Sequence, residues 1–215
     1  EPLVDCVEAL YVPTTGIVDQ NALMRSYIGE IEDSGSNVVF NSQFIKATRN
    51  ENVFEIVIAA SGEETKIKSG ILINASGLYA EKNAKKLDFL DNSFIPKTYL
   101  AKGNYFETGK DLKIRHLIYP IPNEASLGLH LGLDLGMQVR FGPDVEWVDD
   151  IDYKVNPNRL DAFYNDIKKY LPHFDKSLLK PGYSGIRPKL KNKGEGKSDF
   201  LIQGSETHSI KGMVN

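Results

Sequence analysis

The sequence contains a single cysteine, Cys6, in 215 residues. One cysteine excludes an internal disulfide framework and every metal site built from several cysteines. Proteins without disulfides are typical of reducing compartments. We therefore expect a cytoplasmic protein, held together by its hydrophobic core.

Long hydrophobic runs and basic blocks are also missing. No apolar segment approaches the roughly 20 residues that a membrane-spanning helix needs. The chain has 26 Lys and Arg against 29 Asp and Glu, a formal net charge of −3, and its densest positive stretch, 189–197, is interrupted by Gly and Asn. Surfaces that bind nucleic acid normally show clustered Lys and Arg, so we expect no nucleic-acid partner.

An initiating Met and a signal-peptide pattern are absent from the start of the chain. The last residues, 212–215, stop within an apolar stretch. Both ends predict that the sequence is a central piece of a longer protein.

Apolar periodicity predicts an α+β fold with a mixed, largely antiparallel sheet and a few flanking helices. Asp19 is the expected cap of a helix over 20–33, and Asn156 with Pro157 is the expected start of a helix over 157–171. A short helix is expected over 79–87. Strands are expected at 38–40, 43–49, 53–59, 65–68, 71–74, 98–107, 115–120, 127–134, 138–142, 183–190 and 199–203.

Residues 127–135 place leucine at every second position, which predicts a strand with one solid apolar face. The other face carries His130 and Asp134 between glycines. Glycine in a strand often marks the close approach of a ligand or another backbone. Since histidine exchanges protons near neutral pH, His130 is a candidate ligand-facing acid or base, although it also suits a half-buried structural position.

A turn at 135–137 would return the chain so that Leu133 pairs with Val139 and Leu131 with Phe141. This register matches the apolar faces of both strands. It sets Arg140 opposite Gly132, within reach of Asp134. An Arg140–Asp134 ion pair and a ligand-binding arginine are both compatible with this placement.

Arg187 is a second candidate because it follows Gly185 and precedes Pro188. The residue before proline is normally extended. A guanidinium in that position can hold a carboxylate through two parallel hydrogen bonds.

Several segments together resemble FAD-dependent oxidoreductases of the D-amino-acid-oxidase type, with L-2-hydroxyglutarate dehydrogenases and oxidases as the most similar subgroup. The segments follow the order of that family and extend over nearly the whole chain. They are residues 9–19, 73–79, 102–106, 117–122, 128–131, 140–144, 183–188 and 199–202.

The resemblance implies an FAD domain interwoven with a substrate domain. Residues 1–90 would be a partial FAD-binding segment with a connecting helix, and 91–190 the substrate-binding sheet. Residues 191–215 would return toward the FAD domain. The amino-terminal dinucleotide-binding βαβ unit of the family is missing from the sequence.

The same resemblance implies oxidation of a small 2-hydroxy dicarboxylic acid, L-2-hydroxyglutarate to 2-oxoglutarate, with hydride transfer to FAD. Its implied site residues have three roles. His130 is the catalytic base; the substrate-binding residues are Arg187, Tyr105, Arg140 and Lys102; the cofactor-binding residues are Ala75, Ser76, Gly77 and Gly185. No metal is implied.

One departure from the family bears on the cofactor. Residues 69–77 contain only Gly70 and Gly77, which is not the G-x-G-x-x-G turn that brings a backbone close to a pyrophosphate. We therefore expect FAD in the full-length protein but not on this chain, which should be inactive alone. Oxygen and a membrane quinone stay open as electron acceptors, and a quinone would require peripheral contact with the inner membrane. The oligomeric state is also open.

Two other functions stay open at this point, and two more are disfavoured. One is a non-catalytic carboxylate-binding module, and another is an amine or amino-acid oxidase of the same family. A hydrolase using Ser126 or Ser184 is disfavoured because neither serine lies in a Gly-x-Ser-x-Gly elbow. A metal site from His116, His130 and Asp134 lacks a ligand-spacing motif.

Overall fold

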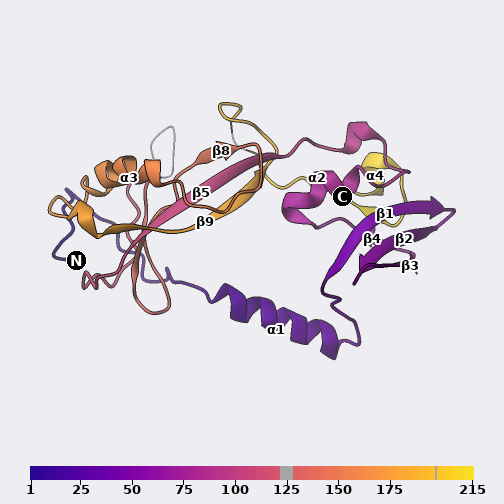
Figure 1. Ribbon diagram of the computed structural model, residues 1–215, viewed down its shortest axis with the longest axis horizontal. Helices are drawn as coiled ribbons and strands as arrows, with labels where there is room; N and C mark the ends of the chain where they lie inside the picture. The colour runs from indigo at the N-terminus through magenta and orange to yellow at the C-terminus, as the bar shows by residue number, and fades with distance from the viewer. Residues whose placement is uncertain (122–127, 197) are drawn as a thin grey trace. The chain divides into compact units, whose positions relative to one another are not determined.

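A computed structural model describes residues 1–121, 128–196 and 198–215. The chain divides into two compact units (Figure 1). The first unit contains residues 1–27 and 101–187, and the second contains 28–100 and 188–215.

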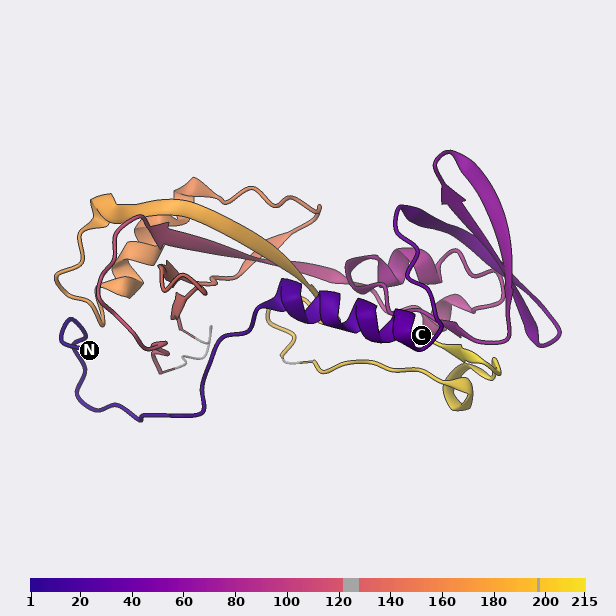
Figure 2. The same ribbon diagram turned by 90° about the horizontal axis from the view of Figure 1, so that it is seen from below.

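The first unit is built on a five-stranded sheet. Its strand order is β6-β7-β5-β8, and β9 also pairs with β5. The strands are β5 (Tyr99–Thr108), β6 (Leu131–Leu133), β7 (Val139–Phe141), β8 (Glu146–Val148) and β9 (Leu179–Lys189). Two of them, β5 and β9, are long and run side by side in both ribbon views (Figures 1 and 2).

A helix covers the apolar face of this sheet. The side chain of Asn156 accepts a hydrogen bond from the backbone of Asn158, which starts the 3-10 turn η3 (Pro157–Arg159) and then α3 (Leu160–Ile167). Phe163 and Ile167, four residues apart and therefore on one helix face, are buried, and the Phe163 ring lies 4.6 Å from that of Phe106. The expected helix start is confirmed, but α3 ends at Ile167 and not at 171.

The second unit contains a three-stranded antiparallel sheet in the order β1-β2-β3. The strands are β1 (Ser42–Asn50), β2 (Val53–Ala60) and β3 (Glu63–Ser69). Three of the expected strands in this region are confirmed. The expected strand at 38–40 is wrong, because residues 38 and 39 have no regular structure and Phe40 lies in a turn that leads into β1.

A second, two-stranded sheet in this unit joins distant parts of the chain. The strand β4 (Leu72–Ile73) runs parallel to β10 (Met213–Val214) and is followed by η1 (Gly77–Tyr79) and α2 (Ala80–Ala84). Shorter helical turns are η2 (Asn92–Phe94) and α4 (Ser205–His208) in this unit, and η4 (Lys176–Leu178) in the first. The buried core of the second unit is Ala47, Phe54, Ala84, Leu87, Leu90, Ile210 and Met213.

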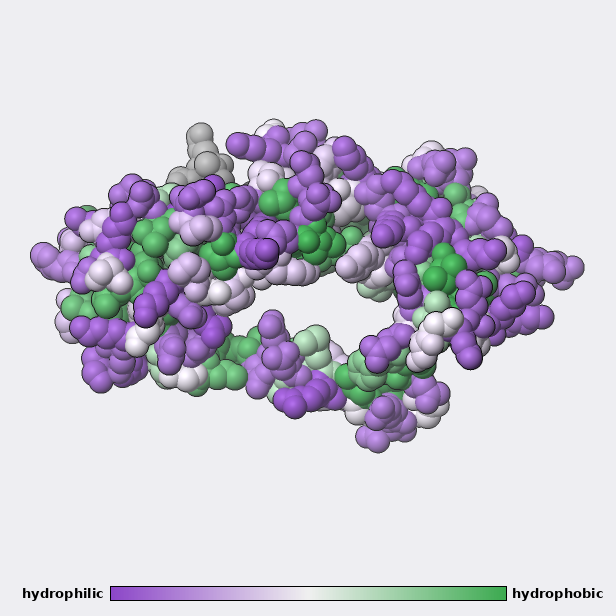
Figure 3. Space-filling view, viewed as in Figure 1, coloured by the Kyte–Doolittle hydropathy of each residue, from purple (hydrophilic) through white to green (hydrophobic). Residues whose placement is uncertain are grey.

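The expected helix 20–33 is confirmed as α1 (Gln20–Asp33), with the Asp19 carboxylate accepting a hydrogen bond from the Ala22 amide at 2.9 Å. None of its residues is buried. Its hydrophobic side chains, such as Leu23 and Tyr27, are exposed. In the space-filling view, hydrophobic residues appear among hydrophilic ones over the visible face (Figure 3).

Further expectations need correction. Residues 115–120 contribute only a single bridge, from Ile118 to Leu131, and 199–203 form no strand. The expected division at residue 90 stays a prediction, and the compact units group residues 1–27 with residues 101–187. A hydrogen bond from the Asp5 amide to the Tyr170 carbonyl and packing of Val4 on the core attach this segment there.

The expected α+β class with a largely antiparallel sheet is confirmed. Among the helices of the described ranges, none has the length and apolar character to cross a membrane.

Candidate functional site

The β6–β7 hairpin has the register expected from its sequence. Leu131 pairs with Phe141, Gly132 with Arg140, and Leu133 with Val139. The turn at 135–137 is also confirmed, with the Met137 amide donating to the Asp134 carbonyl at 2.9 Å.

The described leucines at every second position of 127–135 are buried only in and next to β6. Leu129, Leu131 and Leu133 are buried, whereas Leu135 lies in the turn and is exposed. Leu127 lies outside the described residues. The apolar face of the hairpin is therefore shorter than the sequence pattern.

The cross-strand pairing of β7 continues on its other side, where it pairs with β5. Phe106 pairs with Phe141, and Glu107 with Arg140. Because side chains alternate along a strand, the buried Phe106 and Phe141 fix which face is the core. Tyr105 and Arg140 consequently lie on the opposite, partly exposed face.

On this face, an open pocket of about 550 Å³ brings two arginines and two tyrosines together. Arg187 and Tyr183 come from β9, Tyr105 from β5 and Arg140 from β7. The other residues that line it are Gln20, Gly103, Pro143, Ser184, Gly185 and Ile186. Two cationic groups in one pocket favour an anionic ligand.

The aromatic rings and one arginine of the pocket are stacked. The Tyr105 and Tyr183 rings are nearly parallel, at 10°, with centroids 4.4 Å apart. The Arg140 guanidinium lies 5.2 Å from the centroid of the Tyr183 ring, within the range of a cation–π interaction. Tyr183 therefore links Tyr105 to Arg140.

Burial raises the pKa of the Tyr105 phenol, and the neighbouring Tyr183 adds to the increase, while the charge of Arg187 opposes it. The net increase keeps Tyr105 protonated at neutral pH. A protonated phenol donates a hydrogen bond, so Tyr105 and Arg187 together present donors to an anion.

The Tyr105 ring is seated on the backbone of Gly142. A Cβ atom at this position would lie 2.9 Å from Cδ1 of Tyr105 and 2.7 Å from the carbonyl oxygen of Asn104. Its φ of +132° also disfavours other residues. The glycine is thus required both for backbone angle and for space.

His130 lies on the face that carries Arg140, but the structure does not place it among the residues that line the pocket. Its ring packs edge-on against Tyr119, with centroids 4.5 Å apart. Its carbonyl accepts a hydrogen bond from the Gly142 amide at 2.9 Å, so its backbone neighbours the residue under Tyr105. A catalytic role for His130 stays a prediction.

The structure does not bring Lys102 to the pocket, and this expectation is corrected. Its side chain is 4% exposed and pairs with Asp152 at 3.3 Å. Lys102 and Tyr105 are three positions apart in one strand, so alternation directs them to opposite faces. The alternation of side chains along a strand therefore predicts from the sequence alone that Lys102 and Tyr105 do not share a face.

A partly buried polar network around Asn104 occupies that opposite face of β5. Asn104, which is fully buried, donates to Asp144 at 3.1 Å and to Glu146 at 2.9 Å. Asn156 donates to the second oxygen of Glu146 at 2.6 Å, and Arg159 donates to Asp144 at 2.6 Å. The network ties the segment after Gly142 to β5.

The ionisation state of Glu146 follows from this network. Burial acts to raise its pKa, but hydrogen bonds from Asn104 and Asn156 hold the pKa below its usual value. Glu146 is therefore a charged acceptor at neutral pH, and both amide donors stay paired with it.

The expected cofactor residues Ala75, Ser76 and Gly77 lie in the second unit, after β4. The Ser76 hydroxyl donates to Asn74 at 2.5 Å and accepts from Asn83 at 3.0 Å. Gly77 has a positive φ of +57° where the chain turns into η1. This geometry shapes a strand-to-helix turn.

A pocket of about 350 Å³ lies beside this turn, lined partly by neutral polar side chains, among them Asn74, Thr98, Gln203 and Asn215. Such groups fit hydrogen bonding to part of a dinucleotide. The glycine-rich turn that cradles a pyrophosphate has no counterpart in the sequence. This chain therefore fits FAD only in part.

The sequence interpretation gave Tyr183 no role. It lies four residues before Arg187, on the same face of β9, and lines the same pocket. The alternation of side chains along 183–187 places Tyr183 on the same face as Arg187, and this pattern can be read from the sequence.

Comparison with known proteins identifies the class. A family model described as FAD dependent oxidoreductase matches residues 1–212. The chain therefore belongs to the FAD-dependent oxidoreductase family.

Two curated relatives of the chain are L-2-hydroxyglutarate dehydrogenases. The mitochondrial L-2-hydroxyglutarate dehydrogenase of Arabidopsis thaliana is 35% identical, over 100% of this chain and 53% of its own length. An L-2-hydroxyglutarate dehydrogenase of Indibacter alkaliphilus is 31% identical over 67% of this chain and 36% of its own. The chain thus spans about half the length, or less, of these curated relatives.

Solved structures share the fold. L-α-glycerophosphate oxidase from Mycoplasma pneumoniae with FAD bound matches with a TM-score of 0.68 at 15% identity, over 85% of this chain and 46% of its own. Glycerol-3-phosphate dehydrogenase from Bacillus halodurans complexed with FAD gives 0.70 at 13% identity, over 92% and 38%.

Proposed function

We propose that this chain is the substrate-binding portion of a longer flavin-dependent enzyme that oxidises L-2-hydroxyglutarate to 2-oxoglutarate. The single observation that carries the proposal is the shared pocket of Arg187, Tyr105 and Arg140. Membership of the FAD-dependent family and the names of the relatives supply the reaction class.

In this proposal Arg187 binds the carboxylate next to the reacting carbon. Its planar guanidinium donates two parallel hydrogen bonds, and the protonated Tyr105 donates a third. Arg140 lies beyond Tyr183 and binds the distal carboxylate. Together these groups fix the 2-hydroxy carbon in one orientation, which lowers the entropic part of the barrier.

Oxidation removes a hydride from C2 and a proton from the 2-hydroxyl, which leaves the ketone. The hydride acceptor would be supplied by FAD when it is bound. We assign to His130 the role of the base that accepts this proton. His130 lies on the hairpin face that carries Arg140, and its carbonyl accepts a hydrogen bond from the Gly142 amide. An imidazole can accept a proton from a hydroxyl group within hydrogen-bond reach.

The cofactor site of this chain is incomplete in the proposal. We assign Ala75, Ser76 and Gly77 to part of the FAD site, and a cofactor-binding role for Gly185 stays a separate prediction, while the pyrophosphate-binding turn comes from another part of the longer protein. The isolated chain consequently does not retain FAD.

The test is anaerobic reduction of the flavin in the full-length protein. Reduction is monitored as a loss of absorbance near 450 nm, a wavelength characteristic of oxidised flavins. L-2-hydroxyglutarate is expected to bleach the flavin, and the D enantiomer and L-glutamate are not. The isolated 215-residue chain is the control and should purify without flavin absorbance. Bleaching by L-glutamate alone would establish the amino-acid oxidase instead, and no bleaching would leave a carboxylate-binding module.

A further inference from the structure

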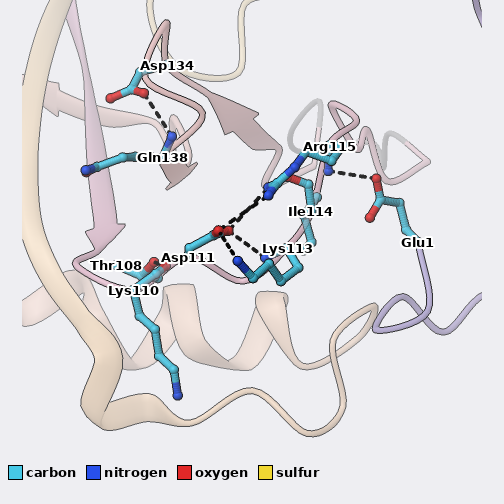
Figure 4. Close-up of polar contacts among 9 residues, drawn as sticks. All are labelled: Glu1, Thr108, Lys110, Asp111, Lys113, Ile114, Arg115, Asp134 and Gln138. Carbon is cyan, nitrogen blue, oxygen red and sulfur yellow. Dashed lines mark hydrogen bonds and ion pairs between the residues drawn. The ribbon is translucent and has the colours of Figure 1, made fainter.

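Asp134 occupies an unusual position for a turn residue, because its two carboxylate oxygens have separate tasks. Oδ1 accepts from the backbone amides of Gly136 at 2.8 Å and Gln138 at 2.9 Å. Oδ2 accepts from Nη2 of Arg140 at 2.9 Å. One side chain therefore closes the hairpin turn and holds a pocket arginine (the Gln138 contact appears in Figure 4).

The guanidinium of Arg140 is fixed from two directions. Asp134 holds one end, and Cζ of the guanidinium lies 5.2 Å from the centroid of the Tyr183 ring. Two such contacts restrict the rotamers of a long side chain, so less entropy is lost when a ligand binds.

Arg140 nevertheless keeps unused donor capacity. Its Nε is buried and has no hydrogen-bond partner among the described residues. The side chain as a whole is 35% exposed, so the guanidinium is still reachable from the pocket.

We propose that Asp134 is the positioning residue that makes Arg140 a fixed subsite for the distal carboxylate, and thereby sets the preference for a dicarboxylic over a monocarboxylic 2-hydroxy acid. This inference rests on the proposed function of the pocket. Asp134 itself does not line the pocket and acts through Arg140.

The test compares two substrates of equal chain length in the full-length enzyme. L-2-hydroxyglutarate has a distal carboxylate, and L-2-hydroxypentanoate has a methyl group there. Asp134→Asn is the informative variant, because its amide oxygen can still accept from Gly136 and Gln138 while the ion pair to Arg140 is lost. The turn is thereby separated from the arginine.

Asp134→Asn is expected to raise KM for L-2-hydroxyglutarate about tenfold, the size of one lost charge-assisted hydrogen bond, with little change in kcat. KM for L-2-hydroxypentanoate and the melting temperature should stay near wild type. In an Arg140→Ala background the same substitution should have no further effect on either substrate.

Asp111→Asn is the matched control. Asp111 also accepts a backbone amide, that of Lys113 at 2.7 Å, and pairs with an arginine, Arg115, at 3.2 Å, but it does not line the pocket (Figure 4). It should leave both KM values unchanged.

The outcomes separate the two proposals. Equal losses for both substrates in Asp134→Asn, or additive losses with Arg140→Ala, would overturn the positioning role while the enzyme stays a 2-hydroxy-acid oxidoreductase. A wild-type enzyme that uses both substrates equally well would also overturn it. A wild-type enzyme that oxidises neither would overturn the proposed function together with this inference.

Discussion

At the residue scale, glycine and alternation decide what the pocket can hold. Gly142 admits the Tyr105 ring, and Tyr105 stacks on Tyr183. The stack then supports Arg140. A small change at residue 142 should therefore propagate to the arginine.

Gly142→Ala is expected to destabilise the full-length protein by roughly 2 kcal/mol or more, because the new Cβ overlaps both backbone and ring. It should also raise KM for L-2-hydroxyglutarate. Chemical denaturation and steady-state kinetics measure the two effects.

Gly132→Ala is the control for this variant, since a Cβ there meets nothing closer than 3.9 Å, at the Arg140 carbonyl. It should change stability little. Equal effects of the two substitutions would contradict the seating of Tyr105 on Gly142.

At the residue scale, the period of the strand accounts for where the structure places the candidate side chains. Arg140 and Arg187 were singled out from local pattern, and both line the pocket. Lys102 was included through the family resemblance although alternation directs it away. The Tyr105–Tyr183 stack joins residues 78 positions apart in the chain, and no local pattern specifies such a contact.

At the scale of elements, β5 carries two different faces. One face presents Tyr105 to the pocket, and the other carries the network around Asn104. Fully satisfied buried networks fix a single arrangement of the strands they join. The network therefore holds the segment that contains Gly142 against β5.

Asn104→Ala should lower the free energy of unfolding by roughly 2–4 kcal/mol, because the half-buried carboxylates of Asp144 and Glu146 each lose a donor. Asn158→Ala, at an exposed position, should cost far less. Urea denaturation of both full-length variants checks this. A small loss for Asn104→Ala would show that the network contributes little to the strand arrangement.

Elements with strong local signals were predictable from sequence. The helix α1 has an aspartate cap and a helical apolar period, and the β6–β7 hairpin has matched apolar faces. The strands β8 and β10 were missed, because each has three residues or fewer and is stabilised by distant partners. A segment such as 199–203 has the composition of a strand, but only Gln203 pairs, with Asn215.

At the scale of the whole molecule, the chain folds into two units made of alternating segments. Sequence composition gives no sign that residues 1–27 join the unit of 101–187, because that association depends on contacts such as Asp5 with Tyr170. The family likeness covers both units, from residue 1 to 212.

The central claim is that the pocket of Arg187, Tyr105 and Arg140 binds the organic acid. The most direct measurement is a crystal structure of the full-length protein with 2-oxoglutarate bound. We expect one carboxylate within hydrogen-bond distance of Arg187 and Tyr105, and the other within hydrogen-bond distance of Arg140. A ligand bound elsewhere, with none of these three side chains in contact with it, would contradict the account.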